Sequence, residues 1–116
     1  MGEEKGMVSK ARTLEKDLRR VVARLVERFD PETIILFGSH ARGDAGLGSD
    51  IDLLVVMPVT GSKREKQLEV RMALPSTVVG VDVIVTRPED YAWRKEVVGT
   101  IEWPAAHEGR VLHAHS

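Results

Sequence analysis

The chain contains no cysteine. Disulfide bonds, thiolate metal sites and a cysteine nucleophile are therefore excluded from any account of its stability or chemistry. The absence also agrees with a reducing compartment, and we expect the protein to be cytoplasmic.

Long apolar runs and an excess of one charge are also missing. No stretch approaches the roughly 20 apolar residues that span a bilayer, and the charged N-terminus has no signal-peptide core, so no membrane attachment is expected. The 17 basic and 18 acidic residues are spread along the chain and give a net charge of −1. A nucleic-acid binder usually has a broad positive field, so we expect no nucleic acid as a partner and only local binding of phosphate.

The apolar content is ordinary. At 42% of 116 residues it is enough for one modest hydrophobic core but not for two. We expect a single domain over residues 1–116, with a core of about residues 13–87 and a C-terminal helical extension over residues 88–116.

Two longer helices are predicted within that core. Apolar residues recur at steps of three and four from Leu14 to Phe29, which is typical of an amphipathic helix, and Pro31 ends the pattern. Ser62 with Glu65 three positions later forms a capping-box pattern, which predicts a second helix through about Leu74.

Three strands are predicted between and after these helices. They are Thr33 to Phe37, Asp50 to Val56, and Val81 to Thr86, each rich in β-branched or aliphatic residues. The last two are separated by a predicted helix, so they form a βαβ unit and should be parallel. The expected fold class is α/β (α+β): a small mixed sheet flanked by helices.

Acidic residues occur at one end of this predicted sheet. Asp50 and Asp52 are two apart on a strand, so both carboxylates leave the same face. Asp82 is one residue into the third strand, at the same end if the two strands are parallel. If the first strand runs antiparallel to the second, Gly38-Ser39 also lies beside this cluster. Three carboxylates and a glycine turn would then converge.

Such a cluster predicts a metal-nucleotide site. Close carboxylates repel one another unless a cation is present, and Mg²⁺ prefers oxygen ligands supplemented by substrate phosphates. Two such ions could hold the attacking and leaving oxygens of a phosphoryl displacement. Gly38 would let the backbone approach a triphosphate, with Ser39 capping a short helix, and Arg42 could balance phosphate charge or pair with a nearby aspartate. Each element alone is common in proteins without such a site, but together they favour it.

Two segments also resemble a known family: Ile34-Ile35-Leu36-Phe37-Gly38-Ser39-His40-Ala41-Arg42-Gly43 and Ser49-Asp50-Ile51-Asp52-Leu53-Leu54-Val55. They are similar to the DNA polymerase beta-like nucleotidyltransferase superfamily, in its minimal nucleotidyltransferase subgroup. The signature there is Gly-Ser, ten residues, then Asp-x-Asp, and this spacing is present here. The resemblance covers about Ile34 to Val85 and implies an α-β-α-β-α-β core.

The resemblance also implies functions for residues. Asp50, Asp52 and Asp82 would be the metal ligands and catalytic carboxylates, with Asp82 as metal ligand or general base. Gly38, Ser39, Arg42 and Ser49 would bind the nucleotide. Minimal members resemble antitoxins that act beside a HEPN-domain toxin, in some cases transferring AMP from ATP onto a toxin tyrosine.

Two functions remain open at this point. The first is a Mg²⁺-dependent nucleotidyltransferase that moves a nucleoside monophosphate, AMP by preference, onto a hydroxyl acceptor. The second is a non-catalytic antitoxin or binding subunit that neutralises its partner by occlusion.

The C-terminal segment is the predicted partner surface. Val97, Val98, Ile101 and Trp103 can line one side of a helix that Pro104 breaks, and a HEPN-like protein or a second copy could dock there. The histidines His107, His113 and His115 are expected in a solvated or frayed end rather than in a metal cluster. His40 is beside the phosphate turn, where it could contact a nucleotide or lie on the surface.

Overall fold

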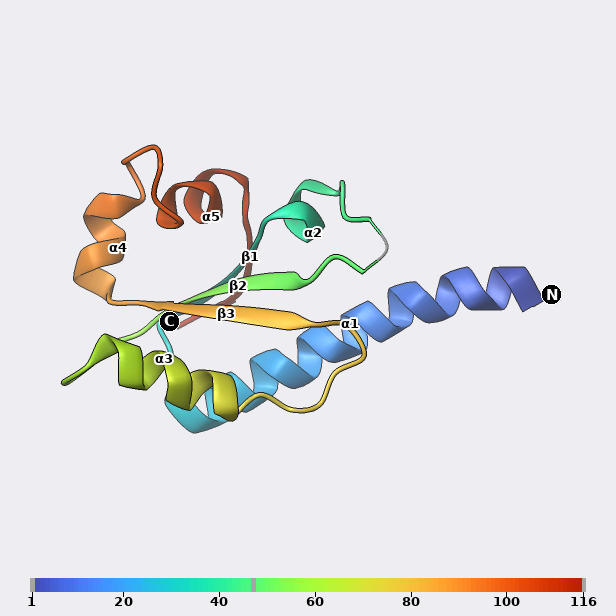
Figure 1. Cartoon of the computed structure of the whole chain (residues 1–116), viewed down its shortest axis with the longest axis horizontal. Coiled ribbons are helices and arrows are strands. Elements are labelled where there is room, and N and C mark those ends of the chain that lie inside the picture. The colour runs from blue at the N-terminus through green and yellow to red at the C-terminus, as the bar shows by residue number, and fades with distance from the viewer. Residues whose placement is uncertain (1, 47, 116) are drawn as a thin grey trace.

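A computed structural model describes residues 2–46 and 48–115, with side chains from residue 12 onward. These ranges contain five helices and four strands, and Figure 1 shows how they are arranged. In chain order they are α1 (Gly2–Phe29), β1 (Thr33–Phe37), α2 (Ser39–Arg42), β2 (Ile51–Val56), α3 (Lys63–Met72), β3 (Val81–Thr86), α4 (Pro88–Arg94), α5 (Glu102–Glu108) and β4 (Arg110–Ala114).

The strands form one mixed sheet in the order β3-β2-β1-β4. Strands β2 and β3 are parallel and are connected through α3, whereas β1 is antiparallel to both β2 and β4. The predicted mixed sheet and the parallel β2–β3 pair are therefore confirmed, and the antiparallel direction of β1 meets the condition for Gly38-Ser39 to lie beside the acidic residues.

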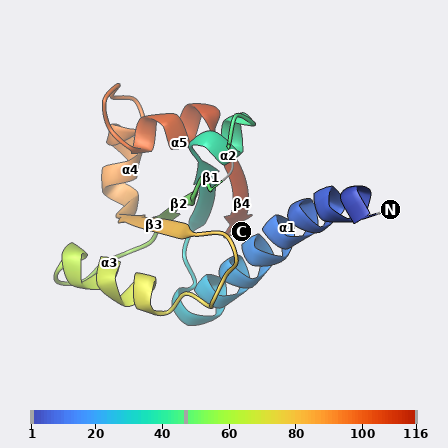
Figure 2. The ribbon, with the colours of Figure 1, turned by 45° about the vertical axis from the view of Figure 1, so that its right-hand side comes forward.

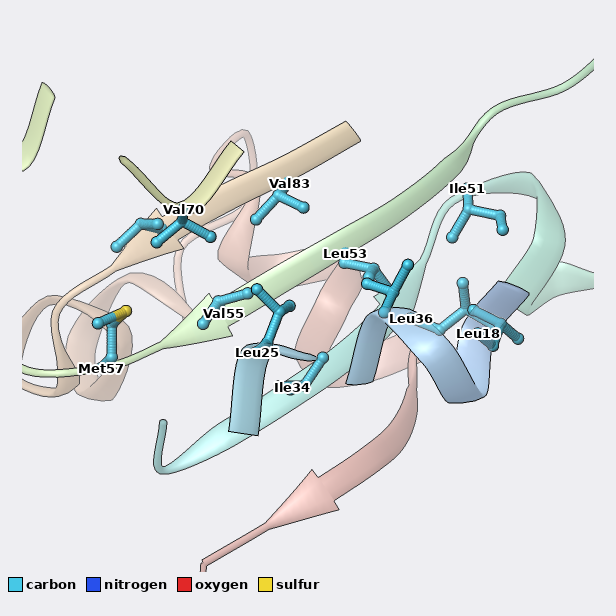
Figure 3. Packing of buried hydrophobic residues seen from close by; sticks show 12 residues of the cluster. Leu18, Leu25, Ile34, Leu36, Ile51, Leu53, Val55, Met57, Val70 and Val83 are labelled. Atoms are coloured by element: carbon cyan, nitrogen blue, oxygen red, sulfur yellow. The ribbon is translucent and has the colours of Figure 1, made fainter. Parts of the chain in front are cut away.

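Helices cover both faces of the sheet, as Figure 2 shows. On one face α1 and α3 pack over the larger core, whose buried side chains are shown in Figure 3. This cluster contains Leu18, Val21, Leu25, Ile34, Leu36, Ile51, Leu53, Val55, Met57, Val70, Val83 and Val85. On the other face, α5 contributes Ala105 to a smaller cluster with Ile35, Phe37, Leu54 and Val56. Because successive strand residues point to opposite faces, β1 and β2 each supply buried residues to both clusters.

The ends of the two predicted helices follow from local chemistry. Helix α1 ends at Phe29, where Asp30 takes a positive φ of 44° immediately before Pro31. The Ser62 hydroxyl accepts a hydrogen bond from the Glu65 amide at 3.2 Å, so the predicted cap of α3 is confirmed. No helix among the described residues has the length and apolarity needed to cross a membrane.

The predicted C-terminal helical extension, residues 88–116, is wrong in its last part. Residues 110–114 form β4, which pairs with β1, and the His115 amide donates to the Glu32 carbonyl at 2.7 Å. The expectation of a frayed end is therefore also wrong for these residues, because backbone pairing with the exposed edge of β1 holds them. Residue 116 lies outside the described residues.

Pro104 does not break a helix. It lies in the first turn of α5, where an amide hydrogen has no partner within the helix and proline is tolerated. Residues 97–101, predicted as part of that broken helix, instead form the turns between α4 and α5.

Candidate active site

The sheet register brings the predicted acidic residues to one end of the sheet. Asp52 pairs with Phe37 across the antiparallel β1–β2 ladder and with Asp82 across the parallel β2–β3 ladder. Asp50 immediately precedes β2, and the Ile51 amide beside it donates to the Gly80 carbonyl at 2.8 Å. Asp52 is therefore between the strand that ends at the glycine turn and the strand that carries Asp82.

Gly38 brings its backbone against the Asp52 side chain. It has a φ of 77°, and a Cβ at this position would overlap Asp52 Oδ2. The Gly38 carbonyl accepts from the amides of Ala41 and Arg42, both at 3.1 Å, which starts α2. A glycine is required here by the close approach and by the backbone angle together.

The prediction that Ser39 caps this short helix is wrong. Gly38 occupies the N-cap position, no side-chain hydrogen bond caps the helix, and Ser39 is already its first residue. The physical reason is the positive φ of Gly38, which turns the chain one residue earlier than the Gly-Ser pattern suggested.

The negative charges of Asp50 and Asp82 act on Asp52. The pKa of Asp52 is raised above the ordinary aspartate value, first by burial and then by the negative charges of Asp82 and Asp50. The positive charges of His40 and Arg42 oppose this rise without cancelling it. Negative charge at Asp52 is thus incompletely compensated by the protein, as expected for a site that takes a cation.

The side chains are less convergent than the sequence predicted. Asp82 Oδ1 is 3.3 Å from Arg71 Nη2, an ion pair between side chains that are each about half exposed. Among residues 2–46 and 48–115, no group of three or more His, Cys, Asp or Glu side chains is arranged to hold a metal ion. Asp82 is on the edge strand β3, where its carboxylate is paired with Arg71 in the last turn of α3.

The donor chemistry nevertheless fits a hard divalent cation. Asp50 and Asp52 offer carboxylate oxygens, the ligands that Mg²⁺ prefers, and the pKa of Asp52 is raised by burial first and by the neighbouring carboxylates Asp82 and Asp50 second. Glycine adjoins each of them, since a Cβ at Gly38 would overlap Asp52 and a Cβ at Gly80 would overlap Asp50. These two residues would hold such an ion, and Asp82 would join them after leaving Arg71.

The residues predicted to bind nucleotide lie between β1 and β2: Gly38 at the turn, Ser39 and Arg42 on α2, and Ser49 in the loop before β2. Arg42 Nε is 3.2 Å from Asp44 Oδ2, so the alternative that Arg42 pairs with a nearby aspartate is confirmed. His40 Nε2 lies 2.9 Å from the Ser49 carbonyl and joins α2 to the start of β2. The Ser49 hydroxyl accepts from the Gly46 amide at 3.0 Å. These contacts hold the loop beside the acidic residues, and nucleotide binding by its side chains remains a prediction.

The C-terminal histidines are separated from one another. His107 contacts the Trp103 carbonyl through Nδ1 and stacks on the Trp103 ring, with centroids 4.5 Å apart. His115 Nε2 is 3.4 Å from Asp30 Oδ1, and His113 lies on β4. They belong to no metal-binding group in the described part of the chain.

Sequence reasoning missed two residues of this region. Arg71 was unassigned, although a basic residue in the last turn of a helix that leads into the Asp82 strand was a usable signal. Gly80 was given no part in the site. Its position two residues before Asp82, in parallel register with β2, could have indicated the close approach of Asp50.

The fold and the acidic glycine-turn site define a small α/β domain of the kind that transfers nucleotides. The sequence model of the nucleotidyltransferase domain family matches residues 18–102, and the chain therefore belongs to that family. The predicted resemblance is thereby confirmed at the level of the family.

Two individual proteins add to this result. A Methanocaldococcus jannaschii protein named as a putative protein adenylyltransferase is 34% identical over 59 residues, which are 51% of this chain and 54% of that protein. The match thus spans about half the length of that curated relative. A crystal structure of a putative nucleotidyltransferase from Sulfolobus solfataricus superposes with a TM-score of 0.65 at 24% identity, covering 94% of this chain and 86% of the other. This second likeness supports the fold alone.

Proposed function

We propose that the protein is a Mg²⁺-dependent nucleotidyltransferase that moves AMP from ATP onto a hydroxyl group of a partner protein. The observation that carries the proposal is the Asp52 carboxylate, held against Gly38 with its pKa raised by burial and by Asp82 and Asp50. The name of the Methanocaldococcus jannaschii relative supports an adenylyl donor and a protein acceptor.

Each residue has a part in the proposed reaction. Gly38 would let the triphosphate approach the backbone, and Ser39 and Arg42 on α2 and Ser49 before β2 would bind it. Two Mg²⁺ ions, when bound by the aspartates, would neutralise phosphate charge and stabilise the transition state. The acceptor hydroxyl oxygen forms a bond to the α-phosphorus as the bond to pyrophosphate breaks. Pyrophosphate leaves with the electron pair, and Asp82 accepts the hydroxyl proton.

We propose a HEPN-domain toxin as the partner and its tyrosine as the acceptor, with the protein acting as antitoxin. We propose that this partner docks on the α4–α5 patch, which we define as Trp93, Val97, Val98 and Ile101. All four side chains are exposed, Val98 at 77%. Trp103, predicted as part of this surface, is half-buried and stacked on His107, so it contributes less.

The test is purification of the protein under native conditions together with the partner. Mass spectrometry should find one or more AMP units on the partner, on tyrosine, and Asp82→Asn should slow the transfer by about 10²- to 10⁴-fold, the contribution of a positioned base. The alternative is neutralisation by occlusion. Equal neutralisation by the parent and by an Asp50→Asn, Asp52→Asn, Asp82→Asn triple variant, with no adduct on the partner, would establish occlusion and refute the enzyme. A homodimer with no second protein would refute the hetero-complex.

A further inference from the structure

Helix α1 contributes a buried carboxylate that is remote in sequence from the acidic cluster. Asp17 is only 3% exposed, and its Oδ2 accepts hydrogen bonds from the amides of Val78 and Val79 at 3.0 and 2.9 Å. One oxygen of a charged group thus binds two consecutive backbone donors in the connection between α3 and β3. Burial of an acidic side chain is costly without such partners, so this contact is a firm attachment point.

The attached loop leads directly to the candidate site. Gly80 follows Val79, accepts the Ile51 amide at 2.8 Å and adjoins the Asp50 carboxylate so closely that a Cβ would overlap it. Strand β3 then starts at Val81 and carries Asp82. A displacement of the backbone at Val79 would therefore move the neighbour of Asp50 and the start of the Asp82 strand together.

Helix α1 holds the other end of the same loop through a second contact. Arg24 Nη1 donates to the Ala73 carbonyl at 3.0 Å, at the point where α3 ends. Asp17 and Arg24 are seven residues apart, about two helical turns, so they lie on the same side of α1. Only the Asp17 contact is adjacent to Gly80, which makes Arg24 a natural control.

We infer that Asp17 is a positioning residue for the metal-nucleotide site, acting through the Val78–Gly80 backbone on Asp50 and Asp82. The inference rests on the proposed function, because it assumes that these aspartates bind a divalent cation. Residues that orient metal ligands through hydrogen bonds commonly change metal affinity by about 10- to 100-fold when they are mutated. Asp17 acts through backbone rather than on a ligand directly, so we expect the lower end of that range.

The experiment compares the parent with Asp17→Ala, Asp17→Asn and Arg24→Ala. Mn²⁺ replaces Mg²⁺ as the probe, and its affinity is measured by calorimetry and by its paramagnetic resonance signal. Hydrogen exchange at the Val78 and Val79 amides reports on the contact itself. We expect Asp17→Ala to speed exchange at both amides and to weaken Mn²⁺ binding about tenfold. Asp17→Asn keeps an acceptor oxygen and should bind Mn²⁺ almost as tightly as the parent. If the alanine variant does not fold, Asp17→Asn is the variant whose Mn²⁺ affinity and amide exchange are measured.

The outcomes separate the inference from the function on which it rests. If the parent binds neither Mn²⁺ nor Mn-ATP, the proposed function fails and the inference fails with it. If the parent binds Mn²⁺ and Asp17→Ala binds it equally well despite faster exchange at Val78 and Val79, only the inference is overturned. An equal loss of affinity in Arg24→Ala would also overturn it, because loosening of the loop in general would then be the cause.

Discussion

Replacing Gly38 by alanine tests the link between the glycine turn and the acidic cluster. The native backbone angles, φ 77° and ψ −156°, are in a region that is essentially restricted to glycine, where another residue costs about 1 to 3 kcal/mol. The added methyl group would also overlap Asp52 Oδ2, so the Asp52 side chain must rotate away. We expect Gly38→Ala to lower the free energy of unfolding by about 2 to 3 kcal/mol and to weaken Mg-ATP binding by at least about tenfold.

Gly43 offers a matched control a few residues further on. It too has a positive φ, 84°, but a Cβ there would meet no atom within 4 Å. Gly43→Ala should therefore destabilise the fold by only about 1 to 2 kcal/mol and leave Mg-ATP affinity unchanged. Urea unfolding and titration calorimetry measure the two quantities. Parental affinity in Gly38→Ala, or an equal loss of affinity in both variants, would refute the argument that contact with Asp52 is what requires this glycine.

Three further predictions concern single side chains. Asp52→Asn should abolish Mg²⁺-dependent nucleotide binding and yet stabilise the metal-free protein at pH 7 by about 0.5 to 1 kcal/mol after solvent screening. Because the folded-state pKa of Asp52 is raised, the carboxylate of the parent becomes protonated as the pH falls, and the gain in stability of the variant over the parent should disappear below pH 3.8. A melting temperature of the variant below that of the parent, in EDTA at pH 7, would contradict this prediction. Glu102 is buried at 3% exposure; burial opposes its charge, but hydrogen bonds from Thr86 and Arg94 prevail and lower its pKa below 4.5. Glu102→Gln should therefore lower the free energy of unfolding by about 2 kcal/mol at pH 7. The difference between parent and variant should shrink as the pH falls through the lowered pKa of Glu102, and a difference in urea unfolding that does not change with pH would contradict this. Arg42→Ala should weaken Mg-ATP binding less than Gly38→Ala does, since Arg42 is partly engaged by Asp44, and calorimetry showing the reverse order would count against this ranking.

The parts of the fold that depend on local patterns could be predicted from the sequence. The apolar runs of β1, β2 and β3 and the capping pattern at Ser62 each specify an element over a few residues, and all four are present. The parallel direction of β2 and β3 followed from the intervening helix, and it placed Asp52 and Asp82 in register. The position of the candidate site was therefore within reach of sequence reasoning.

Features that depend on distant contacts were missed. Strand β4 is short and pairs with a strand from the beginning of the chain, with an irregular register at Ile34 and Ile35, so its pattern carries little local signal. Arg71 was missed because a basic residue at the end of α3 indicates an ion pair only when it is considered together with Asp82 on β3. Asp17 could have been noticed, since it occupies the apolar stripe of α1 between Leu14 and Val21, where a charge requires a buried partner.

The pairing of β4 with β1 has a consequence for biosynthesis. Thr33 is opposite Ala114, its partner 81 positions later in the chain, whereas its partner in β2, Val56, follows after only 23. During translation β1 can pair with β2 early, but its other edge stays open until residues 110–114 have left the ribosome. Closing so long a segment is slow, and an open strand edge is prone to pair with other chains. Nascent protein is thus most exposed to aggregation just before β4 emerges, and a chaperone or an early-binding partner would have its greatest effect in that interval.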